Sequence, residues 1–149
     1  MAGLPTGHDF AVVRRSTMAT VKPIGVHHVS INVSDPGASI DFYTTVLGGR
    51  IRDDRPDFGI GGAWIDLGSA QVHLIESSVP PNMGQHFAIL YDDLDAVVAE
   101  LRDRGVDVED PKVVGPDRQT FVDDPDGNAV ELHQLGPERR SGRGGEVGL

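Results

Sequence analysis

The chain has 149 residues and no cysteine. This absence excludes disulfide bonds and thiolate ligands, so any bound metal ion must be held by histidine and carboxylate side chains. A chain without disulfides is compatible with a cytoplasmic location, without requiring one. We expect that location.

Long apolar runs are also missing. No segment approaches the ~20 consecutive apolar residues that a membrane-spanning helix needs. The first residues lack the basic and then apolar form of a secretory signal, and Met18 is an alternative start. We therefore expect no membrane partner.

Positive charge is scarce in the central part of the chain. The formal net charge is −10, but the terminal segments hold six of the 13 basic and only three of the 23 acidic residues, which leaves −13 on residues 25–135. Phosphate binding needs clustered lysine and arginine. We expect no nucleic-acid partner and instead a small-molecule substrate.

Among the residues that the chain does contain, possible metal ligands recur at a regular spacing. His28 and His73 lie 45 residues apart, as do His86 and Glu131, and the second pair is the first displaced by 58 positions. This spacing indicates a duplicated module. Each copy would give one ligand from its first strand and one from its last.

The pattern around these ligands predicts an α+β fold of two tandem β-α-β-β-β modules, residues 25–76 and 85–135, joined by a linker over 77–84. Each module opens with a strand (28–33 and 86–91), followed by an aspartate that starts a helix and a glycine that ends it. We expect a flexible arm over 1–24 and a disordered tail over 136–149. The remaining strands are predicted at 50–54, 63–67, 70–76, 107–110, 119–123 and 128–134.

Strand alternation gives an independent test of the ligand set. Apolar residues flank His73 and Glu131 and follow His28 and His86, on the opposite parity in each case, so the candidates face away from the helices. We predict a site for one divalent ion, against the alternative of buried histidines without metal. Glu76 is a rival for the place of His73, although its parity favours the strand rim.

These residues resemble the vicinal oxygen chelate superfamily, which includes glyoxalases, bleomycin-resistance proteins and extradiol dioxygenases. The resemblance lies in residues 27–48, 85–89 and 124–132, and it extends over 25–135. It implies that the paired modules form a cup-shaped mixed sheet around one metal ion, with His28, His73, His86 and Glu131 as ligands. It also implies a homodimer, with each cup built from one chain or from two.

The wall of the cup follows from parity and from the resemblance. Trp64 caps the apolar side or is ordinary core, and His133 is a proton shuttle, a support for Glu131 or a plain polar wall residue. Parity or the likeness places the other wall candidates on the same face: Ser30, Asn32, Gln71, Gln119 and Phe121.

Three imidazoles and one carboxylate suit Fe, Mn, Ni, Co or Zn and leave an octahedral ion two open positions for adjacent substrate oxygens. We expect a glyoxalase-like lyase or isomerase that stabilises an enediolate-type anion, with Glu131 as the catalytic group that moves a proton. Glyoxalase I would have a second carboxylate where His73 stands, which counts against plain lactoylglutathione lyase activity.

Two alternatives remain at this point. His28, His86 and Glu131 reproduce the two-histidine, one-carboxylate set of the Fe(II) extradiol dioxygenases, although a fourth ligand at His73 would obstruct oxygen and a bidentate catechol. Fosfomycin-modifying transferases share that set, but no basic groups for a phosphonate are evident. A drug-binding protein without catalysis is the second alternative.

Overall fold

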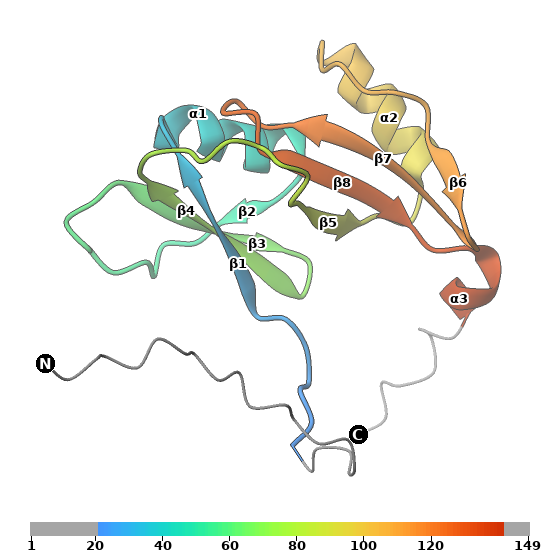
Figure 1. The fold of residues 1–149 in the computed structure, drawn as a ribbon, viewed down its shortest axis with the longest axis horizontal. Coiled ribbons are helices and arrows are strands. Elements are labelled where there is room, and N and C mark those ends of the chain that lie inside the picture. Colours follow the sequence, from blue (N-terminus) through green and yellow to red (C-terminus); the bar gives the residue numbers. More distant parts are fainter. Residues whose placement is uncertain (1–20, 142–149) are drawn as a thin grey trace, which may run out of the picture.

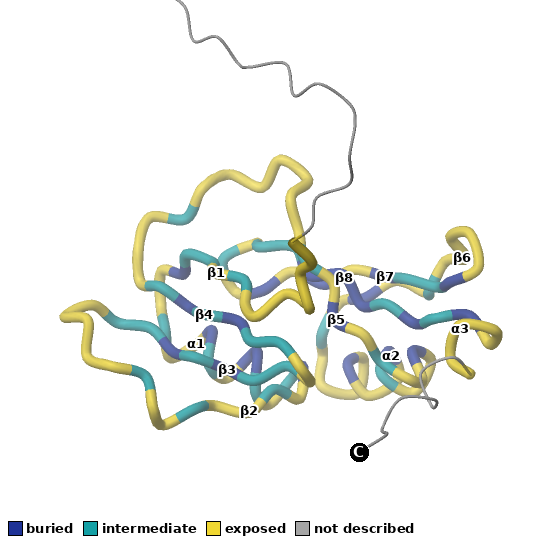
Figure 2. The backbone as a smooth tube through the Cα atoms, turned by 90° about the horizontal axis from the view of Figure 1, so that it is seen from below, coloured by how far each residue is buried: buried dark blue, intermediate teal, exposed yellow. Residues whose placement is uncertain are grey.

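The computed structural model describes residues 21–141 and contains two four-stranded sheets that lie side by side, with α1 packed on one sheet and α2 on the other (Figure 1, Figure 2). The elements are β1 (His28–Val33), α1 (Pro36–Asp41), the π-helical turn η1 (Phe42–Val46), β2 (Arg50–Ile51), β3 (Gly62–Leu67), β4 (Ala70–Glu76), β5 (Phe87–Leu90), α2 (Leu94–Asp103), β6 (Lys112–Val114), β7 (Asp117–Asp123), β8 (Ala129–Gln134) and α3 (Pro137–Ser141).

Both sheets have the same strand order. The first runs β1-β4-β3-β2 and the second β5-β8-β7-β6, and in each the first strand pairs in parallel with the last strand of its own module. The other neighbours are antiparallel. The predicted pair of open, cup-like β-α-β-β-β modules is therefore confirmed.

Matching aspartates start the two main helices. Asp35 accepts a hydrogen bond from the backbone N–H of Ala38, and Asp93 does the same for Ala96. These caps satisfy donors that the first helical turn leaves unpaired. The predicted duplication therefore extends to the entrance of each helix.

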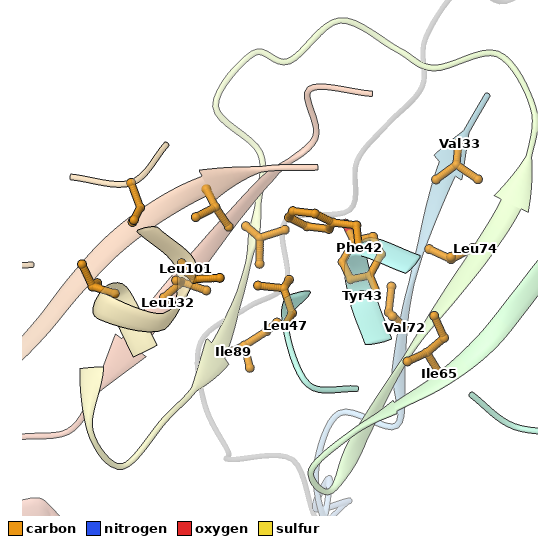
Figure 3. Close-up of a cluster of buried hydrophobic side chains, with 14 of the residues drawn as sticks. Val33, Phe42, Tyr43, Leu47, Ile65, Val72, Leu74, Ile89, Leu101 and Leu132 are labelled. Atoms are coloured by element: carbon orange, nitrogen blue, oxygen red, sulfur yellow. The ribbon is translucent and has the colours of Figure 1, made fainter. Parts of the chain in front are cut away.

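Buried and less buried residues alternate along strands such as β3 and β4, and the buried ones belong to the core (Figure 2). In β4, Val72 and Leu74 are buried while the residues between them are only partly covered. Figure 3 shows these two side chains beside Tyr43 of η1, with Leu101 of α2 and Leu132 of β8 in the other half of the same cluster. Burying a large apolar side chain stabilises the fold by roughly 1.5–3 kcal/mol.

A clasp of hydrogen bonds ties the two modules together. The buried Tyr43 hydroxyl donates to Asp124 Oδ2 at 3.0 Å, and the Asn128 side chain donates to the Asn32 carbonyl at 3.1 Å. Ser34 donates to Asp126 from its backbone N–H and its hydroxyl. The β-turn between β7 and β8 therefore fixes the end of β1 and the helix that follows it.

The structure differs from the predicted elements at three places. The strand predicted at 107–110 is absent, and β6 begins at Lys112, because the Arg102 side chain binds the Val108 carbonyl and the Thr120 hydroxyl binds the Glu109 carbonyl. The strand at 50–54 is only two residues long. Within the tail expected to be disordered, 137–141 form α3.

No helix within residues 21–141 is long and apolar enough to cross a membrane. The predicted arm falls mostly outside the described residues, as does the end of the tail beyond 141.

Candidate metal centre

The first candidate pair lies on neighbouring parallel strands. His28 stands on β1 and His73 on β4, and their rings stack with centroids 3.9 Å apart and planes inclined by 11°. Trp64, on β3, stacks on His73 at 4.7 Å. Because β4 lies between β1 and β3, the imidazole of His73 is held between His28 and the indole.

The hydrogen-bond partners of this pair are an amide and a third imidazole. His73 Nε2 lies 2.9 Å from Gln71 Oε1, and the Nδ1 atoms of His27 and His28 are 2.8 Å apart. Burial lowers the pKa of His73, and the nearby His28 and His27 lower it further. His73 is therefore a neutral imidazole at pH 7, which is the form that binds metal ions.

The second candidate pair joins the residue before β5 to the middle of β8. His86 Nε2 lies 3.0 Å from Glu131 Oε2, and His86 Nδ1 lies 2.9 Å from the Gly84 carbonyl oxygen. A carbonyl oxygen can only accept, so Nδ1 carries the donated hydrogen. In the neutral ring the lone pair then sits on Nε2 and faces a carboxylate oxygen.

Two electron-pair donors at this separation repel each other unless a proton or a cation lies between them. A proton on His86 Nε2 removes the repulsion. The bond to Gly84 raises the pKa of His86, burial opposes this, and Glu131 raises the pKa further. A divalent cation bound by both atoms also removes the repulsion. Two ligand atoms that lie about 2.1 Å from one ion, at a right angle to each other, are about 3.0 Å apart. A second ring nitrogen fixed on a backbone carbonyl is the usual arrangement of a metal-binding histidine.

Glu131 is held on its other side by His133. His133 Nδ1 lies 2.7 Å from Glu131 Oε1, and His133 Nε2 lies 3.0 Å from Asp117 Oδ2. Burial lowers the pKa of His133, but the hydrogen bonds to the two carboxylates outweigh it and the net shift is upward. Both ring nitrogens of His133 thus face carboxylate oxygens, and the ring orients Glu131 with Oε2 turned to His86.

Asp117 anchors this chain of contacts. It is buried and accepts hydrogen bonds from the Gly136 N–H at 2.9 Å and from Arg139 at 2.8 Å. The Gly136 N–H lowers the pKa of Asp117 most, and His133 and Arg139 lower it too, against the effect of burial. Asp117 is thus a fixed negative charge behind His133.

The chain forms two separate ligand pairs. Within residues 21–141, no group of three or more histidine, aspartate and glutamate side chains is arranged to hold a metal ion. The donor types fit a divalent cation, but one chain does not bring the four predicted ligands to one point.

The predicted wall residues fall into two groups. Gln71 and Trp64 contact His73, while Phe121 packs edge-on against His86 at 5.0 Å. His133 contacts Glu131, as described. The others lie nearby: Ser30 and Asn32 line a cleft of about 340 Å³ with His86, and Gln119 is opposite His133 in the strand register.

Three neighbours were not among the predicted residues. His27 precedes β1, so strand alternation does not apply to it, and its ring lies on the same side as His28 and His73. Asp117 reaches His133 from the adjacent strand, a contact that depends on the register of β7 and β8. Arg55 lies in the loop between β2 and β3, where no periodic pattern could indicate its position.

Comparison with known proteins gives the family. The sequence profile of the Glyoxalase/Bleomycin resistance protein/Dioxygenase superfamily matches residues 25–132. The chain belongs to this superfamily.

The names of three similar proteins indicate different activities, or none. The chain is 32% identical over 122 residues to the uncharacterized protein YaeR of Escherichia coli (73% of this chain, 95% of that one). It is 32% identical over 124 residues to lactoylglutathione lyase GLX1 of Arabidopsis thaliana, covering 74% of this chain but 44% of that enzyme. It is 28% identical over 119 residues to metallothiol transferase FosB of Staphylococcus saprophyticus (72% and 75%).

Solved structures share the fold. A glyoxalase family protein from Bacillus anthracis superposes with a TM-score of 0.69 at 21% identity, over 82% of this chain and 99% of that one. TnmS3, an antibiotic-binding protein from Streptomyces sp. CB03234, superposes with a TM-score of 0.67 at 28% identity, over 80% and 100%. The superfamily therefore includes both enzymes and binding proteins.

Proposed function

We propose that this protein is a divalent-metal-dependent enzyme, a glyoxalase-like lyase or isomerase that acts on a small molecule with two adjacent oxygens. The observation that carries the proposal is the contact between His86 Nε2 and Glu131 Oε2 at 3.0 Å, with His86 Nδ1 engaged by the Gly84 carbonyl. Fe, Mn, Ni, Co or Zn suits this donor set.

We propose further that a second copy of the chain completes the site. His28 and His73 of one subunit would then meet His86 and Glu131 of the other. The support is that each pair is separate within one chain. In addition, Leu90, opposite His133 in the strand register, and Phe121, packed on His86, leave 37% and 40% of their surfaces exposed. Apolar surface of this kind favours burial against a partner.

A bound divalent ion supplies Lewis-acid stabilisation of negative charge that develops on substrate oxygen. The residues of the chain supply the rest. Glu131 is the one carboxylate of the set and moves a proton, and His133 holds its Oε1 so that Oε2 faces the substrate side. Phe121 packs edge-on against the His86 ring and limits its movement.

A lyase or isomerase is favoured over a dioxygenase because of His73. Its imidazole is neutral and stacked against His28, so it is suited to act as a fourth ligand, and a fourth ligand leaves no room for both oxygen and a bidentate catechol. The likeness to lactoylglutathione lyase of Arabidopsis also supports this choice. Oxygen uptake with catechols on Fe(II)-loaded protein would reverse it.

Metal analysis of protein purified without chelator tests the proposal. We expect about one divalent ion per chain, with occupancy lost in Glu131→Ala and His86→Ala. Glu100→Ala, on the exposed face of α2, is the control and should bind metal like the wild type. A folded wild-type protein that binds no divalent ion would support the antibiotic-binding alternative suggested by the likeness to TnmS3.

Mixing two inactive variants tests the shared site. One carries His28→Ala and His73→Ala, and the other His86→Ala and Glu131→Ala. If each site uses two subunits, unfolding and refolding them together restores one intact site in every mixed dimer, or about a quarter of the wild-type metal occupancy. If each site is built within one chain, the mixture stays as empty as its parts.

A further inference from the structure

A row of flat side chains leads away from the first ligand pair. His73 stacks on Trp64, and the ring of Phe58 lies 6.2 Å from Trp64, tilted by 49°. The guanidinium carbon of Arg55 lies 5.1 Å from the centre of the Phe58 ring. The row therefore begins at a candidate metal ligand and ends at a positive charge.

Arg55 differs from the neighbouring arginines in having no acidic partner. Arg50 and Arg52 both bind Asp66, at 3.0 Å each. No carboxylate of residues 21–141 forms an ion pair with Arg55, although the net charge of this part of the chain is strongly negative.

The hydrogen bonds of Arg55 are also incomplete. Its Nη2 donates to the Ile60 carbonyl at 3.1 Å, while its Nε is shielded from solvent and has no partner. A shielded donor without a partner costs free energy. The bond to Ile60, which holds the loop, uses one of the five N–H donors of the guanidinium. A role in stabilising the loop therefore does not account for the unpaired Nε.

Arg55 lies at the far end of this row, with Trp64 and Phe58 between it and His73. A molecule that reaches from His73 along Trp64 and Phe58 would therefore end beside the guanidinium.

We propose that Arg55, Phe58 and Trp64 form a subsite for the anionic end of the substrate, a carboxylate carried on a flat apolar group. The guanidinium would take the carboxylate through parallel N–H donors, and the two aromatic rings would cover the flat group. This inference rests on the proposed function, because it treats the pair His28 and His73 as the place of the substrate's other end.

The test uses Trp64, the single tryptophan of the chain, as a fluorescent reporter. Metal-free protein, kept in chelator, is titrated with benzoate and with the neutral benzamide. We expect saturable quenching by benzoate that weakens with salt, and little response to benzamide. Metal-free conditions separate this result from the proposed catalytic function, which can fail while benzoate still binds.

Two variants and a control complete the experiment. Arg55→Gln should weaken benzoate binding at least about tenfold. Arg104→Gln, which loses an exposed pair with Glu100, should bind like the wild type. If Arg55→Gln does not fold, Phe58→Leu should weaken benzoate binding while keeping its salt dependence. Equal binding of benzoate and benzamide, no saturable binding, or wild-type affinity in Arg55→Gln would overturn the proposal.

Discussion

The two ligand pairs occupy equivalent places in the two modules, yet their surroundings differ. His28 and His73 are stacked among aromatic rings, with His27 and the Gln71 amide as their hydrogen-bond partners. His86 and Glu131 belong to a charged network that continues through His133 and Asp117. The duplicated scaffold thus keeps the positions of the side chains and varies their chemistry. Under the proposed function, the first pair binds the metal ion, whereas Glu131 of the second pair also moves a proton.

The largest predicted effect comes from removing the single carboxylate of the set. Glu131→Gln keeps the size of the side chain but removes its charge, so metal affinity should fall by more than about 100-fold. Competition with a chromophoric chelator measures the change. The matched variant Gln71→Glu adds a carboxylate beside His73 and should leave affinity within about tenfold. Undiminished affinity in Glu131→Gln would remove the contrast between the pairs.

A smaller effect is expected behind Glu131. Asp117→Asn removes the negative charge that faces His133 Nε2, so Glu131 is held less firmly and metal affinity should fall about tenfold. The same titration measures it. Asp110→Asn, at an exposed aspartate paired with Arg102, is the control and should change nothing. A wild-type result for Asp117→Asn would show that Glu131 needs no support from its charged neighbours.

The clasp between the modules should contribute to stability rather than to metal binding. Tyr43→Phe leaves buried Asp124 Oδ2 without the hydroxyl donor, so the free energy of unfolding should fall by about 1–2 kcal/mol. Urea denaturation of metal-free protein measures this. Tyr91→Phe, which loses a bond from a less buried hydroxyl to the Leu47 carbonyl, should cost about 1 kcal/mol or less. A larger loss in Tyr91→Phe would contradict this ranking.

The smallest effect is a difference in titration between the pairs in metal-free protein. His73 has a pKa below the ordinary 6.5, so its contribution to stability is present above pH 6.5 and is lost as pH falls through its folded pKa. His86 and His133 have raised pKa values. Their contribution to stability is therefore present below pH 6.5 and is lost as pH rises through their folded pKa values. NMR titration of the imidazole resonances checks these opposite signs, and His73 titrating above His86 would contradict them.

Much of the fold could be predicted because the repeat and the strand alternation are local patterns. The 58-residue offset predicted the two modules, strand alternation predicted β1 and β8, and the capping aspartates predicted both helices. The strand expected at 107–110 was wrong because the Arg102 and Thr120 side chains bind the carbonyls of that segment, a tertiary contact without a local signal.

The candidate site could be predicted less completely. Side chains on one strand were assigned correctly to one face, as for Glu131 and His133, which are in contact. Asp117 and Arg55 were missed because their positions depend on strand register and on the path of a loop. Whether the two pairs meet depends on how two sheets, or two chains, lie together, and no spacing within the sequence encodes that.

The clasp also sets the smallest piece of this chain that can fold alone. The Tyr43 hydroxyl donates across the module boundary to Asp124, and the backbone carbonyl of Asn32 accepts from the Asn128 side chain. A fragment cut within 77–84 would expose these groups on either side of the break. Each half would then lose the hydrogen-bond partners that the other module supplies, unless a second copy of the same half covered that surface.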